Sequence, residues 1–254
     1  MPGGPQPRSR EERRILAQNI ARQILARRGT DVRAVGIYGS VAQGRDGPYS
    51  DLEMIAVLRT AGEDFTREWT PGPWKAEVNF MSQDLVLAEA QKVDELWPIT
   101  HGAFVHIQAL HDPEDFFPQV GNLALAQGEE KFQAALRELI VGDLYELVGK
   151  VRNARHAADW GALPFLAVHV AFRGALLQGL AHRHLYASGA SALRESLSLG
   201  DPPQGHKALV HRVIQGKLDR GPELADLVDQ FWHGVEKWAA SRGLGFEEGE
   251  CLPL

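Results

Sequence analysis

Apolar residues near the start of the chain follow the spacing of a helix. Leu16, Ile20 and Ile24 recur every four residues, which places them on one face of an amphipathic helix. Ser9 followed by Glu12 is the sequence pattern of a capping box, and Gly29 is suited to end a helix. We therefore predict a helix from Ser9 to about Arg28, preceded by a disordered Pro- and Gly-rich segment, residues 1–8.

The next hundred residues are predicted to contain strands. Segments 33–38, 51–58 and 74–80 have the composition or alternation of strands, and 102–110 is a fourth candidate. Residues 39–50 are predicted to be a connecting loop. Long helical patterns then follow at 128–156, 163–187, 205–216 and 221–242. Strands followed by helices indicate an α+β fold, with one domain over 9–127 and a helical bundle over 128–254.

Charge and composition narrow the classes of function. The net charge of −6 disfavours a nucleic-acid partner, because phosphate backbones are bound through clustered Lys and Arg. The single cysteine, Cys251, excludes an internal disulfide and fits a reducing compartment. The N-terminus lacks the apolar core of a signal peptide, and no apolar run reaches the roughly 20 residues that span a bilayer. We therefore expect a soluble cytoplasmic protein that does not bind membranes.

The segment Gly39-Ser-Val-Ala-Gln-Gly44 and the acids that follow it are the main candidates for chemistry. Asp51 and Glu53 are two residues apart, so in a strand both point to the same face. If the strand with Glu77 lies beside theirs, three carboxylates meet, and a hard cation such as Mg²⁺ offsets their repulsion. The alternative for Asp51 and Glu53 is a solvated strand face. Ser40 and backbone N–H groups of the turn can bind phosphate, although such a turn also occurs without any ligand. No Gly-Lys-Ser/Thr follows, so the segment is not a P-loop.

A second group of charged residues lies in the helix predicted at 128–156. Asp143, Glu146 and Lys150 share one face of that helix. They are read either as a routine surface ion pair or as a general base beside a cation that binds phosphate. The sequence contains neither a His/Cys zinc pattern nor a Gly-x-Ser-x-Gly elbow.

Together these motifs resemble a known family. Gly-Ser-x-Ala-x-Gly followed by Ser-Asp-x-Glu is similar to the pattern of polymerase-β-like nucleotidyltransferases. The longer segments YGSVAQGRDGPYSDLEM, REWTPGPWKAEVNF, WPITHGAF, LIVGDLYELVGKVRN and FWHGVEKW resemble the aminoglycoside 4'-O-nucleotidyltransferases. The resemblance runs from about residue 10 to the C-terminus.

The resemblance implies a polymerase-β-like nucleotidyltransferase domain with a mixed sheet, a helical C-terminal domain, and a homodimer with its sites at the interface. It implies transfer of AMP from ATP to the 4'-hydroxyl of an aminoglycoside, with Mg²⁺ as cofactor. Two rival functions are a nucleotidyltransferase that acts on a protein acceptor and a non-catalytic nucleotide-binding dimer.

The resemblance also implies roles for individual residues. The metal ligands are Asp51 and Glu53, and the general base is Glu146. Lys150 matches the basic residue that contacts the nucleotide phosphates, and Glu77 matches the third acidic position of the site. On their own chemistry, Gly39, Ser40, Arg45 and Ser50 are further candidates for nucleotide contacts. Glu77, Glu68 and Asp143 are expected to attract the drug's ammonium groups, and Lys75 is a further candidate for substrate binding. Two positions depart from the family: Gln43 replaces an Arg found in many relatives, and Gly142 replaces an acidic residue.

Overall fold

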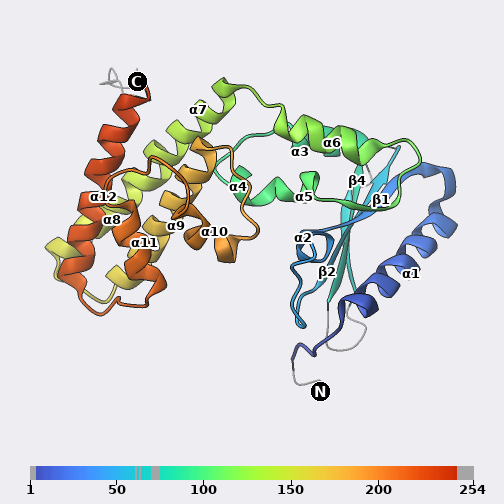
Figure 1. The fold of residues 1–254 in the computed structure, drawn as a ribbon, viewed down its shortest axis with the longest axis horizontal. Helices are drawn as coiled ribbons and strands as arrows, with labels where there is room; N and C mark the ends of the chain where they lie inside the picture. The colour runs from blue at the N-terminus through green and yellow to red at the C-terminus, as the bar shows by residue number, and fades with distance from the viewer. Residues whose placement is uncertain (1–3, 61, 63, 70–74, 245–254) are drawn as a thin grey trace. The chain divides into compact units, whose positions relative to one another are not determined.

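The computed structural model describes residues 4–60, 62, 64–69 and 75–244. Within these ranges the chain forms two compact units (Figure 1). The first contains the residues up to Lys92 together with Thr100–Gln127, and the second contains Val93–Ile99 and the residues from Gly128 onward. The short segment Val93–Ile99, which the sequence places in the first domain, therefore packs with the helical unit. Cys251 and Trp74, the first residue of the strand predicted at 74–80, lie outside the described residues.

The predicted N-terminal helix is confirmed as α1, Arg10–Arg28. Its capping box is formed in both directions: the Glu12 N–H donates to Ser9 Oγ over 3.2 Å, and the Ser9 N–H donates to Glu12 Oε2 over 2.8 Å. Ile20 and Ile24 of the apolar face are buried. A short 3₁₀ turn, Gly29–Asp31, then leads into the sheet.

The first unit is built on a five-stranded mixed sheet. Its strands are β1 Val32–Tyr38, β2 Leu52–Leu58, β3 Phe65–Trp69, β4 Ala76–Ser82 and β5 Gln108–His111. Their spatial order is β3-β4-β2-β1-β5, with β2 and β4 parallel and every other pair antiparallel. Because the strands lie in one unit and most helices in the other, the predicted α+β class is confirmed.

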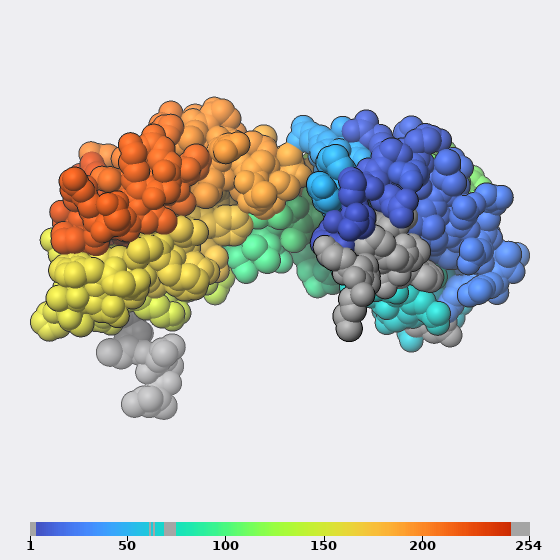
Figure 2. Space-filling model, turned by 90° about the horizontal axis from the view of Figure 1, so that it is seen from below, coloured from blue at the N-terminus to red at the C-terminus, as the bar shows by residue number. Residues whose placement is uncertain are grey.

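Helices cover the sheet on both faces, as Figure 1 shows. α1 packs on one face through a core that includes Ile20, Val35 and Met54. α3, Gln83–Ala90, and α6, Phe116–Leu125, pack on the other, over Ala34 and Val57. The outer side of α1 is visible on the surface in Figure 2. Alternating strand residues therefore serve two separate cores.

The structure differs from the sequence prediction in this unit, and two segments have another secondary structure than expected. Residues 39–50 were expected to be loop, but Gly39–Ala42 forms a single helical turn, α2. Residues 102–110 were expected to be strand, but they contain α5, Gly102–Val105, and only the start of β5. The run Gly102-Ala-Phe-Val is short and apolar, so its periodicity does not separate helix from strand.

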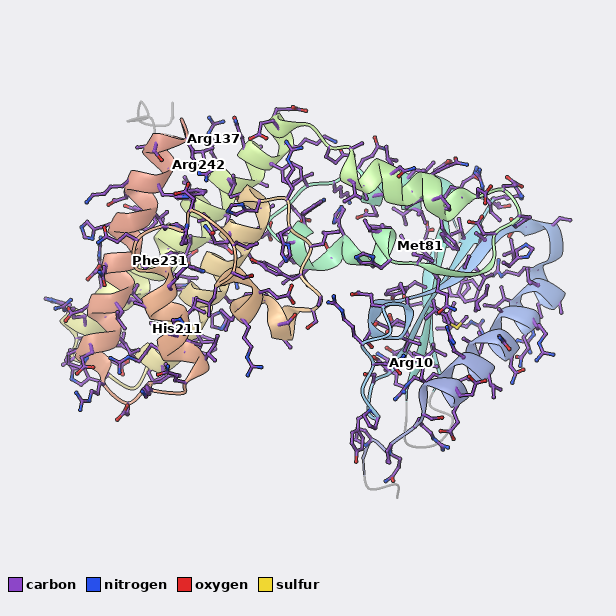
Figure 3. All side chains as sticks on the ribbon, viewed as in Figure 1. Arg10, Met81, Arg137, His211, Phe231 and Arg242 are labelled. Atoms are coloured by element: carbon purple, nitrogen blue, oxygen red, sulfur yellow. The ribbon has the colours of Figure 1, made fainter. Side chains whose placement is uncertain are left out.

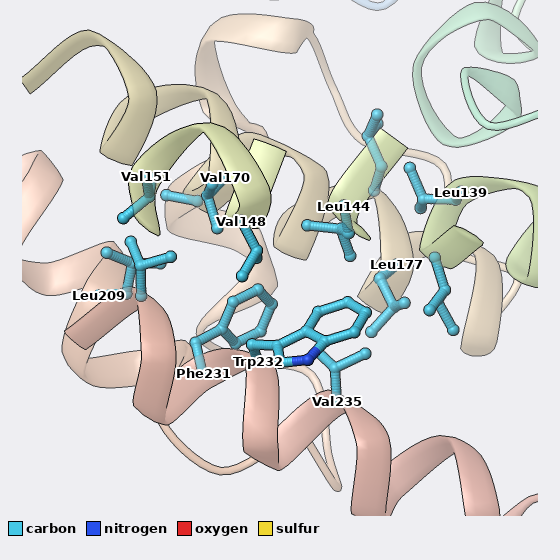
Figure 4. Packing of buried hydrophobic residues seen from close by; sticks show 14 of the residues in the cluster. Leu139, Leu144, Val148, Val151, Val170, Leu177, Leu209, Phe231, Trp232 and Val235 are labelled. Carbon is cyan, nitrogen blue, oxygen red and sulfur yellow. The ribbon is translucent and has the colours of Figure 1, made fainter. Parts of the chain in front are cut away.

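The second unit consists mainly of helices. They are α4 Trp97–Thr100 at its edge, α7 Glu129–Glu138, α8 Tyr145–His156, α9 Leu163–Ala181, α10 Gly189–Ser196, α11 His206–Ile214 and α12 Gly221–Ser241. The helix predicted at 128–156 is interrupted between α7 and α8 by a π-helical segment, Leu139–Leu144. Figure 4 shows the shared core, in which Leu144, Val148, Leu177, Phe231 and Trp232 meet.

Helix α9 is the most apolar helix of this unit. Among the described residues it is the one helix whose length and composition would allow it to cross a membrane. In the structure 67% of its apolar window is buried within the protein, as expected for the central helix of a bundle. Its apolar character is therefore explained by packing.

Candidate active site

Acidic side chains line one end of the sheet. Glu53 on β2 is the direct neighbour of Glu77 on β4, and Glu77 is in turn opposite Glu68 on β3. The second predicted strand and the strand with Glu77 are therefore neighbours, which meets the condition for their carboxylates to lie together. Three strands that are adjacent in space place one carboxylate each in a row.

Asp51 adds a fourth acid immediately before β2. It is exposed, and the following residue, Leu52, anchors the strand through its N–H, which donates to the Lys75 carbonyl over 3.0 Å. Asp51 is not itself part of β2, so the predicted strand begins one residue later than expected.

The environment of Glu53 disfavours its charged form. Burial, together with the negative charges of Asp51 and Glu77, raises its pKa to about 6, while the nearby positive charge of Lys75 acts in the opposite direction. A half-buried carboxylate with two like-charged neighbours is a place where a cation is stabilising. Perturbed carboxyl groups of this kind are more frequent at functional sites than elsewhere.

Lys75 is the cation that the chain itself supplies to this row of acids. Its Nζ lies 2.7 Å from Glu68 Oε1 and 3.0 Å from Glu77 Oε2. These hydrogen bonds raise the pKa of Lys75 above its usual value. One ammonium group therefore serves two carboxylates, and neither Asp51 nor Glu53 pairs with it.

The first residue of the glycine motif is in direct contact with the acids. Gly39 has a φ of +70°, and a Cβ at this position would lie 1.9 Å from Glu53 Oε2. Only glycine fits, because a side chain would both strain the backbone and displace the carboxylate. The turn predicted to approach phosphate and the strand with the predicted metal ligands therefore meet at Gly39 and Glu53.

Two uncharged residues that sequence reasoning missed belong to this site. Asn79 Nδ2 donates to Tyr38 Oη over 2.6 Å and to Glu77 Oε1 over 3.1 Å. Burial and the nearby charge of Glu53 raise the pKa of Tyr38 above its usual range, so this phenol stays protonated. Asn79 is two residues after Glu77 on the same strand face, and that spacing is the signal that could have identified it.

Three of the predicted nucleotide contacts, Ser40, Arg45 and Ser50, follow Gly39 in the same segment. The Arg45 N–H donates to the Ser40 carbonyl over 2.9 Å, and Ser50 Oγ accepts the Gly47 N–H over 3.0 Å. Arg45 and Gln43 line a cavity of about 300 Å³. His106 and Gln108 also line it, and neither was identified from the sequence. A larger cavity, of about 530 Å³, is lined partly by α1 residues. It lies on the opposite face of the sheet from the carboxylates of Glu53 and Glu77.

The acids at the sheet end can supply part of a metal site. Among the described residues, no group of three or more His, Cys, Asp or Glu side chains is arranged to hold a metal ion. Mg²⁺ in nucleotide enzymes takes one or two carboxylates and completes its octahedron with waters and substrate phosphates. Asp51 and Glu53 fit that donor set, because both supply oxygen and both lie close to the glycine turn.

The remaining candidates lie in the second unit and are paired with bases. Glu146 Oε1 lies 2.6 Å from Lys150 Nζ, and both side chains are exposed. Asp143 Oδ2 accepts a hydrogen bond of 2.9 Å from Arg173 Nε. Asp143 and Gly142 belong to the π-helical segment, a rare geometry that is often found at functional sites.

Comparison with known proteins places this geometry in a family. Residues 114–245 match a family model that is described as "KNTase C-terminal domain". An aminoglycoside nucleotidyltransferase (4') from Bacillus sp is 39% identical over 251 residues, and one from Staphylococcus aureus is 38% identical over 251 residues. Each alignment covers 99% of this chain and 99% of the relative.

A solved structure supports the fold alone. It is a nucleotidyltransferase-like protein from Exiguobacterium sibiricum 255-15, with a TM-score of 0.56 and 10% sequence identity, covering 89% of this chain and 76% of that chain. The relatives, in contrast, match over nearly their whole length at 38–39% identity. The chain therefore belongs to the family of aminoglycoside (4') nucleotidyltransferases.

Proposed function

We propose that this protein transfers AMP from Mg²⁺-ATP to the 4'-hydroxyl of aminoglycoside antibiotics and so inactivates them. The observation that carries the proposal is the contact between the glycine turn at Gly39 and the acids around Glu53. A turn that approaches phosphate beside unneutralised carboxylates is suited to a nucleotide with its cation. Relatives that are 38–39% identical and are named for this activity support the choice of acceptor.

Asp51 and Glu53 would hold the Mg²⁺ ion together with phosphate oxygens of ATP. When bound, Mg²⁺ neutralises charge that develops on the phosphates during transfer. Two features of the chain favour binding of this ion. Gly39 leaves room for the Glu53 carboxylate, and the half-buried position of Glu53 keeps it within reach of a cation.

The reaction is an in-line displacement at the α-phosphorus. The oxygen of the drug's 4'-hydroxyl forms a bond to phosphorus, the bond to the pyrophosphate oxygen breaks, and the hydroxyl proton passes to the carboxylate of Glu146. Lys150 and Ser40 donate hydrogen bonds to phosphate oxygens. In the free protein Lys150 neutralises Glu146, and its movement to phosphate would leave that carboxylate free to accept the proton.

The drug's ammonium groups would be bound by the acids that are not committed to the metal. Glu77 and Glu68 share only Lys75 between them, so their net charge is negative. Asp143 serves the same purpose in the second unit, where its partner is Arg173. Such charges place a polycation and steer it toward the protein, which is itself acidic.

The proposed enzyme is a homodimer in which Glu146 serves the nucleotide site of the neighbouring protomer. Exposed apolar side chains next to Glu146 support this: Val141 is 54% exposed and Tyr145 is 66% exposed. Asp51→Asn and Glu146→Gln variants, each inactive alone, should regain about a quarter of wild-type activity when mixed under subunit exchange, since half the dimers are then mixed and each has one intact site. No recovery would mean that each chain completes its own site.

The activity is tested by mass spectrometry. Kanamycin, tobramycin and amikacin are incubated separately with the protein, ATP and Mg²⁺, and a gain of one AMP on any drug is the expected result. Asp51→Asn is the matched control, because it keeps the shape of the side chain but removes its charge. Label from ATP that enters a protein acceptor, with all drugs unmodified, would contradict the proposal and favour the rival acceptor.

A further inference from the structure

A buried ion pair ties α1 to the loop that precedes the acids. Arg13 on α1 is 1% exposed, and its Nη1 lies 3.1 Å from Oδ2 of Asp46, whose side chain is 2% exposed. Removing two charges from water is costly, and replacing such a pair by apolar residues is often neutral or stabilising. Stability alone is therefore a weak reason for a buried pair at this position.

The guanidinium of Arg13 makes five hydrogen bonds. Besides Asp46, its acceptors are the carbonyl oxygens of Arg8 at 3.0 Å, Gly47 at 2.9 Å, Pro48 at 2.6 Å and Ser50 at 2.8 Å. A guanidinium has five N–H donors in a rigid fork, so the number of bonds equals the number of donors. Three of the five bonds go to backbone oxygens between residues 47 and 50, and this fixes the path of the loop.

Arg10 adds a second, more exposed set of bonds to the same loop. It projects from the first turn of α1 (Figure 3), and its Nε donates to Asp46 Oδ1 over 2.6 Å. Its Nη2 donates to the Gly44 carbonyl over 2.7 Å. Asp46 thus receives one arginine on each carboxylate oxygen, and the loop is held at both ends.

These bonds end at the residue before Asp51. Ser50 is held through its carbonyl by Arg13, and Leu52 is held through its N–H by the carbonyl of Lys75. The backbone on both sides of Asp51 is therefore fixed, although Asp51 itself is exposed and has freedom only in its side chain.

We propose that Arg13, Asp46 and Arg10 are positioning residues that set the Asp51 carboxylate for cation binding. This inference rests on the proposed function, because it assigns a role to the loop only if Asp51 binds the cation of the nucleotide. The clamp, meaning these three side chains, is bonded to the loop and not to the Asp51 side chain. It acts through the backbone of residues 44–50.

Variants can separate positioning from folding. Arg10→Ala removes only the exposed set of bonds, and Asp46→Asn removes the buried charge without changing side-chain shape. Arg14→Ala is the matched control, since Arg14 is an exposed arginine on the same helix. Each protein is titrated with Mn²⁺ in the presence of a non-hydrolysable ATP analogue, with free Mn²⁺ measured by electron paramagnetic resonance. Thermal midpoints and hydrogen exchange of the peptide that covers 44–52 are measured alongside.

The expected result is weaker Mn²⁺ binding without loss of the fold. Loss of the two Arg10 bonds should weaken Mn²⁺ binding about fivefold or more, the scale of one or two net hydrogen bonds. Exchange over 44–52 should accelerate, and the drug KM and thermal midpoint of Arg10→Ala should stay close to those of Arg14→Ala. Asp46→Asn should show a larger loss of Mn²⁺ affinity.

Two outcomes would overturn the inference. One is wild-type Mn²⁺ affinity in both clamp variants. The other is loss of thermal stability with unchanged Mn²⁺ affinity per folded molecule, which would assign the clamp to folding alone. If wild-type protein transfers AMP to a drug but the variants bind Mn²⁺ normally, only the clamp inference fails. If wild-type protein transfers no AMP, the proposed function fails.

Discussion

The two units of the molecule treat their acidic residues differently. In the first unit, Asp51, Glu53, Glu77 and Glu68 gather at one end of the sheet, and in the part of the chain that the structure describes their ion pairs are those of Lys75 with Glu68 and Glu77. In the second unit, each candidate acid has its own base: Glu146 pairs with Lys150, and Asp143 pairs with Arg173. The first arrangement is short of positive charge, and the second is balanced.

The difference indicates which unit needs a cation. Burial and close carboxylates both raise the pKa of Glu53, and a cation between the carboxylates would offset their repulsion. Paired acids such as Glu146 have no such need, and exposed pairs contribute little to stability. Under the proposed function the first unit binds the metal and the nucleotide, and the second exchanges its ion pairs for substrate contacts.

The largest expected effect comes from removing a charge in the first unit. Asp51→Asn should abolish AMP transfer, because an amide is a poor ligand for a hard cation. The measurement is the rate of drug modification at saturating Mg²⁺. Asp84→Asn, at an exposed acid on α3 of the same unit, should retain normal activity. Unchanged turnover by Asp51→Asn would remove Asp51 from the metal site.

The second largest effect is expected in the second unit. Glu146→Gln should lower kcat by about 10²–10⁴-fold, the usual range for loss of a general base. Binding of Mn²⁺ and the ATP analogue should stay normal, because the first unit is unchanged. Glu138→Gln, an exposed acid on α7, serves as control. Turnover of Glu146→Gln close to that of the control would rule out Glu146 as the base.

The sequence predicts the parts of the fold that repeat regularly. The stripe of α1 and the strands around Glu53 and Glu77 follow from periodicity, and their adjacency makes one carboxylate row. The edge strand β3 was missed because its segment Phe65-Thr-Arg-Glu-Trp69 pairs on one side only and carries polar residues there. The π-helical segment was missed because a single wide turn does not change the apolar pattern of a helix.

The candidate site was predictable where its residues are close in the sequence or lie on strands that the sequence pattern identifies, as for Glu53 and Glu77. The spacing of Asp51 and Glu53 places them together, but Asn79 and Tyr38 meet across 41 positions. Arg13 and Asp46 meet across 33 positions, and nothing local marks either as buried. Such contacts depend on strand order and on the path of a loop, which hydrophobic patterns do not specify.

A moderate effect is expected from changing the charge balance at the sheet end. Under the proposed function Glu53 binds the cation as a carboxylate, so at limiting Mg²⁺ the rate should fall as pH falls through about 6, the value to which burial and neighbouring acids raise its pKa. Lys75 lowers that pKa. Lys75→Met should therefore move the acid limb of the kcat/KM profile to higher pH. Lys92→Met is the control, and an unmoved limb in Lys75→Met would show that another group sets it.

The second unit also holds a buried titratable group, and its ring tautomer can be deduced. His206 is fully buried, and its Nε2 lies 3.1 Å from Ser196 Oγ. Ser196 gives its one hydroxyl proton to the Leu193 carbonyl over 2.9 Å, so it must accept the proton of His206 Nε2. Nδ1 is then an acceptor with no hydrogen-bond partner within the described residues. Protonation would bury an unpaired charge, and burial lowers the pKa of His206 to about 4.

The smallest predicted effect is on stability, and it belongs to the second unit. Because His206 takes up a proton near its ordinary pKa of about 6.5 only when unfolded, the free energy of unfolding should decrease as pH falls from there toward 4. The loss between pH 7 and pH 5 should be about 2 kcal/mol. In His206→Gln most of this pH dependence should disappear, although the variant is less stable at pH 7. Urea unfolding followed by the fluorescence of Trp232 and Trp238, both in the core of this unit, measures it. Equal losses in both proteins would show that His206 is not the group responsible.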